Sequence, residues 1–276
     1  MRIALCNEVL ASMAFEQQCA YAASLGYDGL EIAPFTLSES PDQLSDADAQ
    51  RVRRIAEQHG LAIVGLHWLL VNPEGLSITS ADAALRARTV AVLKRLTELC
   101  AAMGGKVMVH GSPKQRTVAD GDSKETALKR ARDCFAEVAE TAARVGVVYC
   151  VEPLGRFEAQ LINTVDEAAA LVRDVGKPAL KTMIDCSAAS LNETEPVAQL
   201  IDRWLPTGLI GHVQLNDRNR RGPGQGEDRF APVLAALKRN DYRGAIGIEP
   251  FDYLPDGPGS AARAIGYVRG ILEALA

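Results

Sequence analysis

Three acidic side chains stand at the ends of short apolar runs, and they are the residues of this sequence best suited to do chemistry. Glu152 and Glu249 occupy matching Val-Glu-Pro and Ile-Glu-Pro contexts, and Asp185 follows Met-Ile. A strand-end acid can simply accept backbone N–H groups from the next loop. Burying three carboxylates together, however, is costly unless a cation or hydrogen bonds compensate them. The matching contexts therefore predict a metal site formed by Glu152, Asp185 and Glu249.

A fourth ligand is expected from the run Gly-His-Val-Gln at 211–214. Gln214 and His212 are two residues apart and so point to the same side of a strand. We favour Gln214 because it lies nearer the strand end, and His212 is the alternative. Three carboxylates and an amide form an all-oxygen set, which suits Mn²⁺ or Mg²⁺ better than Zn²⁺. We expect Mn²⁺ first, with Mg²⁺ and Co²⁺ as alternatives.

Two carboxylates beside a metal-bound hydroxy-carbonyl compound can move a proton. The metal stabilises the enediolate that forms when a C–H proton leaves. We expect Glu152 and Glu249 to be this catalytic pair, one removing the proton as a general base and the other able to return it. Return to the opposite face gives an epimer, and return to the neighbouring carbon gives an aldose–ketose isomer. The expected partner is a small carbohydrate substrate.

The elements that position these residues alternate regularly along the chain. Eight short runs rich in Val, Ile or Leu are typical of strands buried on both faces of a parallel sheet. They are 3–7, 29–33, 62–67, 106–110, 147–152, 180–185, 209–214 and 245–249. Longer amphipathic stretches follow them at 14–25, 46–59, 82–103, 123–145, 165–175, 196–205, 230–239 and 260–276. Asp82, Ser123 and Ser260 are the expected N-caps of three of these helices.

Eight strands and eight helices in alternation predict an α/β fold, and we expect a single (β/α)₈ TIM barrel. The 276 residues match the roughly 250 typical of that fold. No glycine-rich phosphate fingerprint follows the first strand, which weakens the doubly wound alternative. No linker divides the chain, so residues 1–276 are expected to form one domain. All carboxyl ends of the strands then face one mouth, where barrel enzymes carry out their reactions.

Other strand ends also carry polar groups. His67 and His110 are predicted to bind substrate, although a lone histidine at a strand end is often a structural donor. Glu31 is expected either at the site or paired with a polar group of a neighbouring strand. After the fourth strand, Lys114 and Arg116 could contact an anionic substrate, or they could be two surface cations of a solvated loop.

Composition excludes several other classes of protein. The net charge is −5, with 35 acidic against 30 basic residues, whereas duplex nucleic-acid binders usually show a basic excess. No stretch approaches the roughly 20 apolar residues of a membrane span, and no signal-peptide core follows the first residues. We therefore expect a cytoplasmic protein without nucleic-acid or membrane partners. Barrel enzymes often self-associate, so a homo-oligomer is a further expectation. The six cysteines form no CxxC pair and are interpreted as buried small hydrophobes.

At these motifs the sequence resembles the xylose-isomerase-like TIM-barrel superfamily, specifically its ketose 3-epimerases and hydroxypyruvate isomerases. The resemblance covers essentially the whole chain. It is carried by Val-Glu-Pro-Leu-Gly-Arg-Phe-Glu at 151–158, Met-Ile-Asp at 183–185, His-Val-Gln at 212–214, Asn-Arg-Arg-Gly-Pro-Gly-Gln-Gly at 219–226 and Ile-Glu-Pro at 248–250. It implies a metal-dependent sugar isomerase in which Glu158 and Arg220 bind substrate. Without the resemblance, Arg220 could be part of a solvated basic loop.

Two positions depart from the pattern of the epimerases. They usually carry His where this chain has Gln214, as hydroxypyruvate isomerases do, and both groups tend to have a substrate-binding His where this chain has Ala188. Three other functions stay open: a hydroxypyruvate-type isomerase, a lyase that performs β-elimination on a keto sugar, and a non-catalytic sugar-binding barrel. The endonuclease-IV-like branch uses several zinc ions and needs more histidines than the four in this chain.

Overall fold

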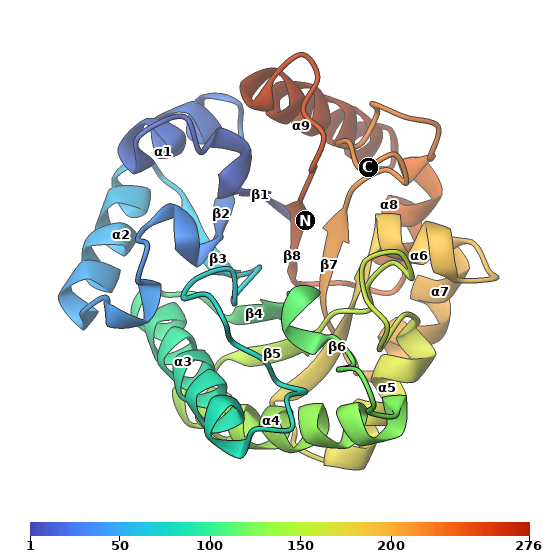
Figure 1. The fold of residues 1–276 in the computed structure, drawn as a ribbon. Helices are drawn as coiled ribbons and strands as arrows, with labels where there is room; N and C mark the ends of the chain where they lie inside the picture. The colour runs from blue at the N-terminus through green and yellow to red at the C-terminus, as the bar shows by residue number, and fades with distance from the viewer.

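The computed structural model describes all 276 residues and shows a closed barrel of eight parallel strands in sequential order, with β1 paired to β8. The predicted (β/α)₈ barrel is thereby confirmed. Figure 1 looks along the barrel, with the strands at the centre and the helices in a ring around them. The strands are β1 (Arg2–Cys6), β2 (Gly29–Ile32), β3 (Ala62–Leu66), β4 (Val107–His110), β5 (Val148–Val151), β6 (Leu180–Asp185), β7 (Ile210–Leu215) and β8 (Ala245–Ile248).

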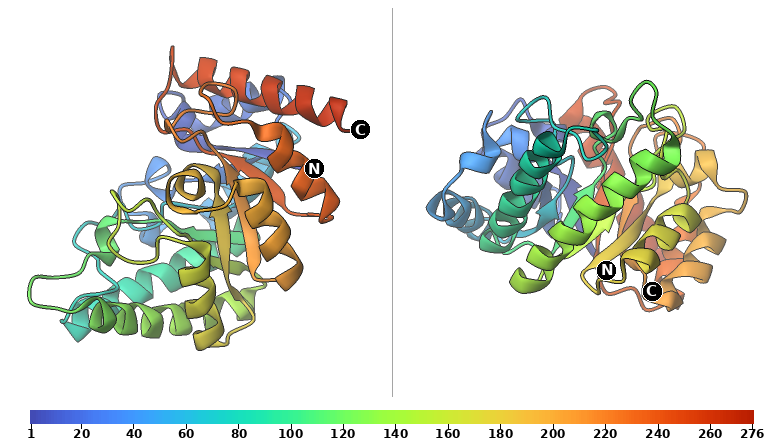
Figure 2. Two further views of the ribbon diagram at one scale, coloured as in Figure 1. Left: turned by 90° about the vertical axis from the view of Figure 1, so that its right-hand side faces the viewer. Right: turned by 60° about the horizontal axis from the view of Figure 1, so that its bottom comes forward.

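The helices cover the outer face of the barrel along its length (Figure 2). No helix combines the length and the apolar character needed to cross a membrane. The two termini lie close together (Figure 2), because the chain starts in β1, which pairs with β8, and ends in the helix that follows β8. The helices are α1 (Phe15–Ser24), α2 (Asp46–Gln58), α3 (Ala83–Ala102), α4 (Lys124–Val145), α5 (Val165–Val175), α6 (Cys186–Asn192), α7 (Val197–Trp204), α8 (Phe230–Arg239) and α9 (Gly257–Ala274).

The helix termini show where sequence reasoning succeeds and where it does not. The side chains of Asp82 and Ser123 cap α3 and α4 by accepting backbone N–H groups, as predicted. The prediction for Ser260 was wrong, because Asp256 caps α9 one turn earlier by accepting from the Gly259 N–H. The short helix α6 was not predicted. It begins directly after Asp185, whose side chain caps it.

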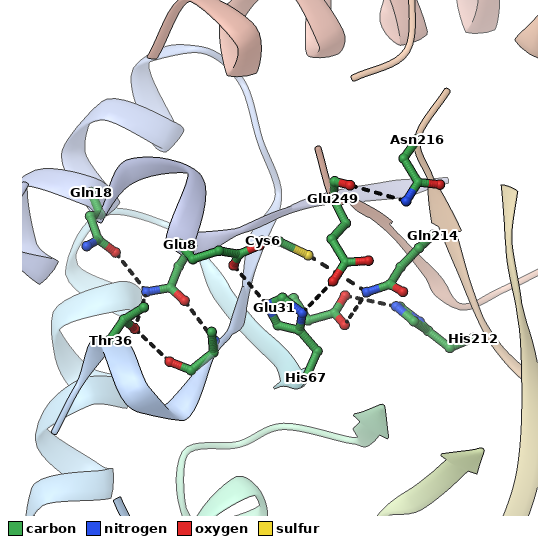
Figure 3. A network of polar contacts seen from close by, with 12 residues as sticks. Cys6, Glu8, Gln18, Glu31, Thr36, His67, His212, Gln214, Asn216 and Glu249 are labelled. Carbon is green, nitrogen blue, oxygen red and sulfur yellow. Dashed lines mark hydrogen bonds and ion pairs between the residues drawn. The ribbon is translucent and has the colours of Figure 1, made fainter. Parts of the chain in front are cut away.

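The barrel interior contains two layers of side chains, an apolar layer on one side and a polar layer on the other. On the side of β4–β6, Val109, Cys150 and Met183 form a small apolar cluster that is separate from the main core. On the side of β1–β3 and β7, the interior is instead filled by buried polar side chains that hydrogen-bond one another. They include Cys6, Glu31, His67, His212 and Gln214 (Figure 3). The main apolar core lies outside the strands, between the sheet and the helices.

Candidate active site

The three predicted carboxylates meet at the mouth of the barrel. Glu152 follows β5, Asp185 ends β6 and Glu249 follows β8, and one carboxylate oxygen from each lies within 4.8 Å of the others. All three residues are 4–5% exposed. Burial raises the pKa of Asp185 to about 6 and of Glu249 to about 8, and the pKa of Glu152 is also raised, by burial and by the other two carboxylates. At this spacing the three carboxylates favour their protonated forms on their own, and a bound cation would stabilise the ionised forms.

Asp185 is held by α6, which it caps, and by Asn216, which directly follows β7. Its Oδ1 accepts a hydrogen bond from the Ala188 N–H at 2.7 Å, and its Oδ2 accepts one from Asn216 Nδ2, also at 2.7 Å. The Asn216 side chain in turn accepts from the Ser187 N–H and donates to the Glu249 carbonyl oxygen. Sequence reasoning missed Asn216. The available signal was its spacing of two residues from Gln214, which places both on the same face of the strand.

Gln214 lies beside Glu249 in the barrel interior, with its amide in a defined orientation (Figure 3). Its Nε2 donates to Glu31 Oε1 at 3.0 Å, whereas its Oε1 is buried without a hydrogen-bond partner. The amide oxygen is therefore an acceptor left free for a cation. His212 is less available, because its Nε2 lies 2.9 Å from the other oxygen of Glu31. Glu31 thus pairs with polar groups of β7 across the barrel interior, and not with a strand that neighbours β2 as one of its two expected roles had it.

The carboxylate of Glu249 is held in place by His67, which lies below it. His67 Nδ1 lies 2.8 Å from Glu249 Oε1, and His67 Nε2 lies 2.9 Å from Glu8 Oε2 (Figure 3). Burial disfavours a charged imidazole, but Cys6, Glu8 and Glu249 outweigh it and raise the pKa of His67 well above its ordinary value. The protonated ring can donate to both carboxylates. Glu249 Oε2 is buried and has no partner, so it remains available to a cation.

Glu152 is positioned by the backbone and by a buried arginine. A Cβ added at Gly111 would lie 1.7 Å from Glu152 Oε2, so only glycine leaves room for the carboxylate where it stands. Arg116 is 1% exposed and donates from Nη1 to the Glu152 carbonyl oxygen at 2.8 Å. Burial lowers the pKa of Arg116 to about 10. The alternative that Arg116 is a surface cation of a solvated loop is therefore wrong.

A cavity of about 120 Å³ opens directly above the carboxylates. Glu158 and Arg220, the predicted substrate-binding pair, both line it and are joined by an ion pair of 2.7 Å. The Arg220 guanidinium lies 4.7 Å from the centre of the Phe251 ring, within the range of a cation–π contact. Trp68 packs edge-to-face on Phe251 from the other side. Trp68 and Arg220 both have positive φ, which is uncommon outside glycine and frequent at functional sites.

The two histidines predicted to bind substrate do not line this cavity. His67 lies below Glu249. It therefore does not make the expected direct contact with substrate, and instead positions the carboxylate of Glu249. His110 points outward, where its ring meets Phe135 of α4 edge-to-face and its Nδ1 lies 2.7 Å from the Tyr149 hydroxyl. Since Val109 faces the barrel interior, the next side chain must face the helices. This placement corrects the expectation that His110 binds substrate.

Comparison with known proteins agrees with the fold. Residues 19–271 match the family described as xylose isomerase-like TIM barrel, and the chain belongs to this family. D-psicose 3-epimerase of Agrobacterium fabrum is 29% identical over 83% of this chain and 76% of its own length. A 3-dehydro-D-guloside 4-epimerase of Escherichia coli is 22% identical over 90% of this chain and 92% of its own. A crystal structure of D-psicose 3-epimerase with D-fructose superposes with a TM-score of 0.82 at 23% identity, covering 99% of both chains.

Proposed function

We propose that this protein is a divalent-metal-dependent epimerase or isomerase that acts on a small keto sugar by moving a proton between Glu152, Glu249 and a substrate carbon. The observation that carries the proposal is the meeting of three buried carboxylates under one cavity. The curated relatives named above are epimerases of keto sugars, which supports the same class of reaction.

The residues present fit a hard divalent cation. Glu249 Oε2 and Gln214 Oε1 are buried acceptors without partners, and Glu152 and Asp185 add two carboxylates. Such an oxygen-rich set suits Mn²⁺, our first choice, or Mg²⁺ or Co²⁺. A cation bound there would stabilise the negative charge that develops on the substrate oxygens. We propose Glu152, Asp185, Gln214 and Glu249 as the ligands.

Glu152 and Glu249 then divide the proton transfer. They come from β5 and β8, with β6 and β7 between them, so they reach the cavity from different directions. One carboxylate accepts the proton from the carbon next to the carbonyl, and the other donates a proton to the intermediate. Glu158 and Arg220 line the cavity above and are proposed to bind the substrate hydroxyls. Donation to the opposite face would give an epimer.

Incubation with ketoses and hydroxypyruvate in D₂O with Mn²⁺, followed by NMR, tests this function. Deuterium should enter the substrate at a single carbon as the epimer or isomer accumulates. Glu152→Gln and Glu249→Gln should each lower the rate of exchange by at least about 10²-fold, because each removes a group that transfers a proton. Lys124→Gln, at the exposed start of α4, is a control that should retain the activity. Products of β-elimination, or unchanged exchange in both glutamate variants, would contradict the proposal.

A second experiment addresses the metal. Protein purified without chelator should contain close to one divalent ion per chain, and EDTA should abolish the exchange until Mn²⁺ is restored. Metal-free protein with full activity would contradict a role for the four ligands.

A further inference from the structure

The amide of Gln214 can serve as a metal ligand in only one of its two orientations. An amide group has one oxygen, which accepts hydrogen bonds and binds cations, and one NH₂ group of nearly the same size, which only donates. Packing against neighbours of this size would therefore accept either orientation. A half-turn of the group would bring N–H hydrogens toward the cation in place of the oxygen. A hydrogen-bonding partner has to select the orientation that leaves the oxygen free.

The partner of the Gln214 NH₂ group is a carboxylate from a distant strand. Glu31 lies on β2, which pairs with β1 and β3, so its side chain crosses the barrel interior to reach β7 (Figure 3). Glu31 Oε1 accepts from Gln214 Nε2 at 3.0 Å, and Gln214 Oε1 is left without a hydrogen-bond partner. An ionised carboxylate only accepts hydrogen bonds, so a turned amide would set two oxygens against each other. Glu31 therefore favours the orientation that a cation needs.

Two further residues confine the Glu31 carboxylate beside this amide. His212 Nε2 lies 2.9 Å from Glu31 Oε2, so the second carboxylate oxygen is engaged as well. Gly247 on β8 is paired in register with Gln214. A Cβ at Gly247 would lie 2.5 Å from Glu31 Oε2 and 3.0 Å from Gln214 Cγ. The contact between carboxylate and amide thus depends on the absence of a side chain at this position.

Building on the proposed function, in which Gln214 is a metal ligand, we infer that Glu31 is a positioning residue that turns the Gln214 amide oxygen toward the bound cation. Glu31 acts through Gln214, because it does not line the cavity and is not one of the three carboxylates that meet beneath it. Satisfying His212 would need only one of its two oxygens. The other oxygen has the separate task of holding the Gln214 NH₂ group.

A double-mutant cycle on Mn²⁺ affinity, measured by calorimetric titration, tests this inference. Glu31→Met removes the acceptor and lets the Gln214 amide turn, so the affinity should fall about tenfold or more, as is typical for partners of metal ligands. Glu31→Gln is the matched control. It also removes the charge, but its amide oxygen can still accept from Gln214 while its NH₂ group donates to His212. This variant should keep the affinity within about threefold.

Gln214→Met supplies the second arm of the cycle. No amide remains to be oriented in that background, so adding Glu31→Met should lower the Mn²⁺ affinity by no more than about twofold. An equal loss in both backgrounds would overturn the inference, because Glu31 would then act through its charge or through the fold. A loss in Glu31→Gln as large as in Glu31→Met would overturn it for the same reason. Unchanged affinity in Gln214→Met would also overturn it, by removing Gln214 from the ligands.

Gly247→Ala replaces Glu31→Met in the cycle if the melting curve shows that Glu31→Met does not fold, because the added methyl group would displace the Glu31 carboxylate. The cycle measures metal binding rather than turnover, so it separates the inference from the proposed reaction. Absence of Mn²⁺ binding would overturn the inference together with the proposed metal site. Ketoses that exchange no deuterium, in a protein that shows the expected cycle, would contradict only the proposed reaction.

Discussion

The two sides of the barrel interior support the site in different ways. Beneath Glu249, side chains do the positioning: His67 hydrogen-bonds its carboxylate and is itself held by Glu8. Beneath Glu152 lies the apolar layer, and its carboxylate is positioned by the absence of a side chain at Gly111. Glu249 is thus held in place by a hydrogen bond to its carboxylate, and Glu152 by the space that Gly111 leaves for its carboxylate. The two members of one proposed catalytic pair should therefore respond to different kinds of substitution.

The first prediction tests whether the space at Gly111 positions the carboxylate of Glu152. Gly111→Ala would place a methyl group 1.7 Å from Glu152 Oε2. The carboxylate is the flexible end of a side chain, so it should rotate away while the fold persists. Displacement of a reacting group by about 1 Å costs on the order of 10²-fold in rate, and we expect that loss in deuterium exchange.

Gly266→Ala in α9 is the control for that substitution. A Cβ at Gly266 meets nothing within 4 Å, so the melting temperature and the exchange rate should change little. Full activity of Gly111→Ala would mean that the carboxylate of Glu152 need not lie where the structure places it.

The same comparison shows what the sequence could reveal. Glu152, Asp185 and Glu249 were predictable because a charged residue at the end of an apolar strand is conspicuous on its own. The direction of His110 was not, because β4 is buried on both faces and its apolar run does not show which residues face inward. Within the barrel, only the pairing of strands settles that question.

The partners of the ligands were beyond sequence reasoning for a different reason. His67 meets Glu8 and Glu249, which are 59 and 182 residues away along the chain. No local pattern encodes such a contact. Gln214 illustrates the intermediate case: its position was predicted from spacing, whereas its orientation depends on Glu31, 183 residues away. The barrel itself was predictable because its period of strand and helix is local and repeats eight times.

The second prediction tests whether the hydrogen bonds of His67 position the carboxylate of Glu249. His67→Phe removes both hydrogen bonds and leaves Glu249 free to turn. Loss of such a partner of a metal ligand typically costs 10- to 100-fold in metal affinity, and we expect a loss in that range for Mn²⁺, measured by calorimetry. His67→Gln can still donate one hydrogen bond and should recover part of the loss.

Met183→Leu in the apolar layer is the contrasting control. It conserves volume and touches no polar partner, so its cost should stay below about 1.5 kcal/mol of stability, with metal affinity unchanged. A drop in Mn²⁺ affinity as large as that of His67→Phe would show that the two layers do not differ in the way proposed.

The last prediction concerns how the stability of the metal-free protein depends on pH. The raised pKa values of Asp185, about 6, and Glu249, about 8, mean that the folded state favours their protonated forms. A group whose pKa is higher in the folded than in the unfolded state stabilises the fold at low pH and loses that contribution as pH rises through the folded value. The melting temperature of metal-free protein should therefore fall by several degrees between about pH 5 and pH 9.

Mn²⁺ should reverse this fall in melting temperature, because it binds the ionised carboxylates. Glu249→Gln should flatten the pH profile of the metal-free protein. A melting temperature that rises with pH in metal-free protein would contradict the clustering of these carboxylates, on which both sides of the comparison depend.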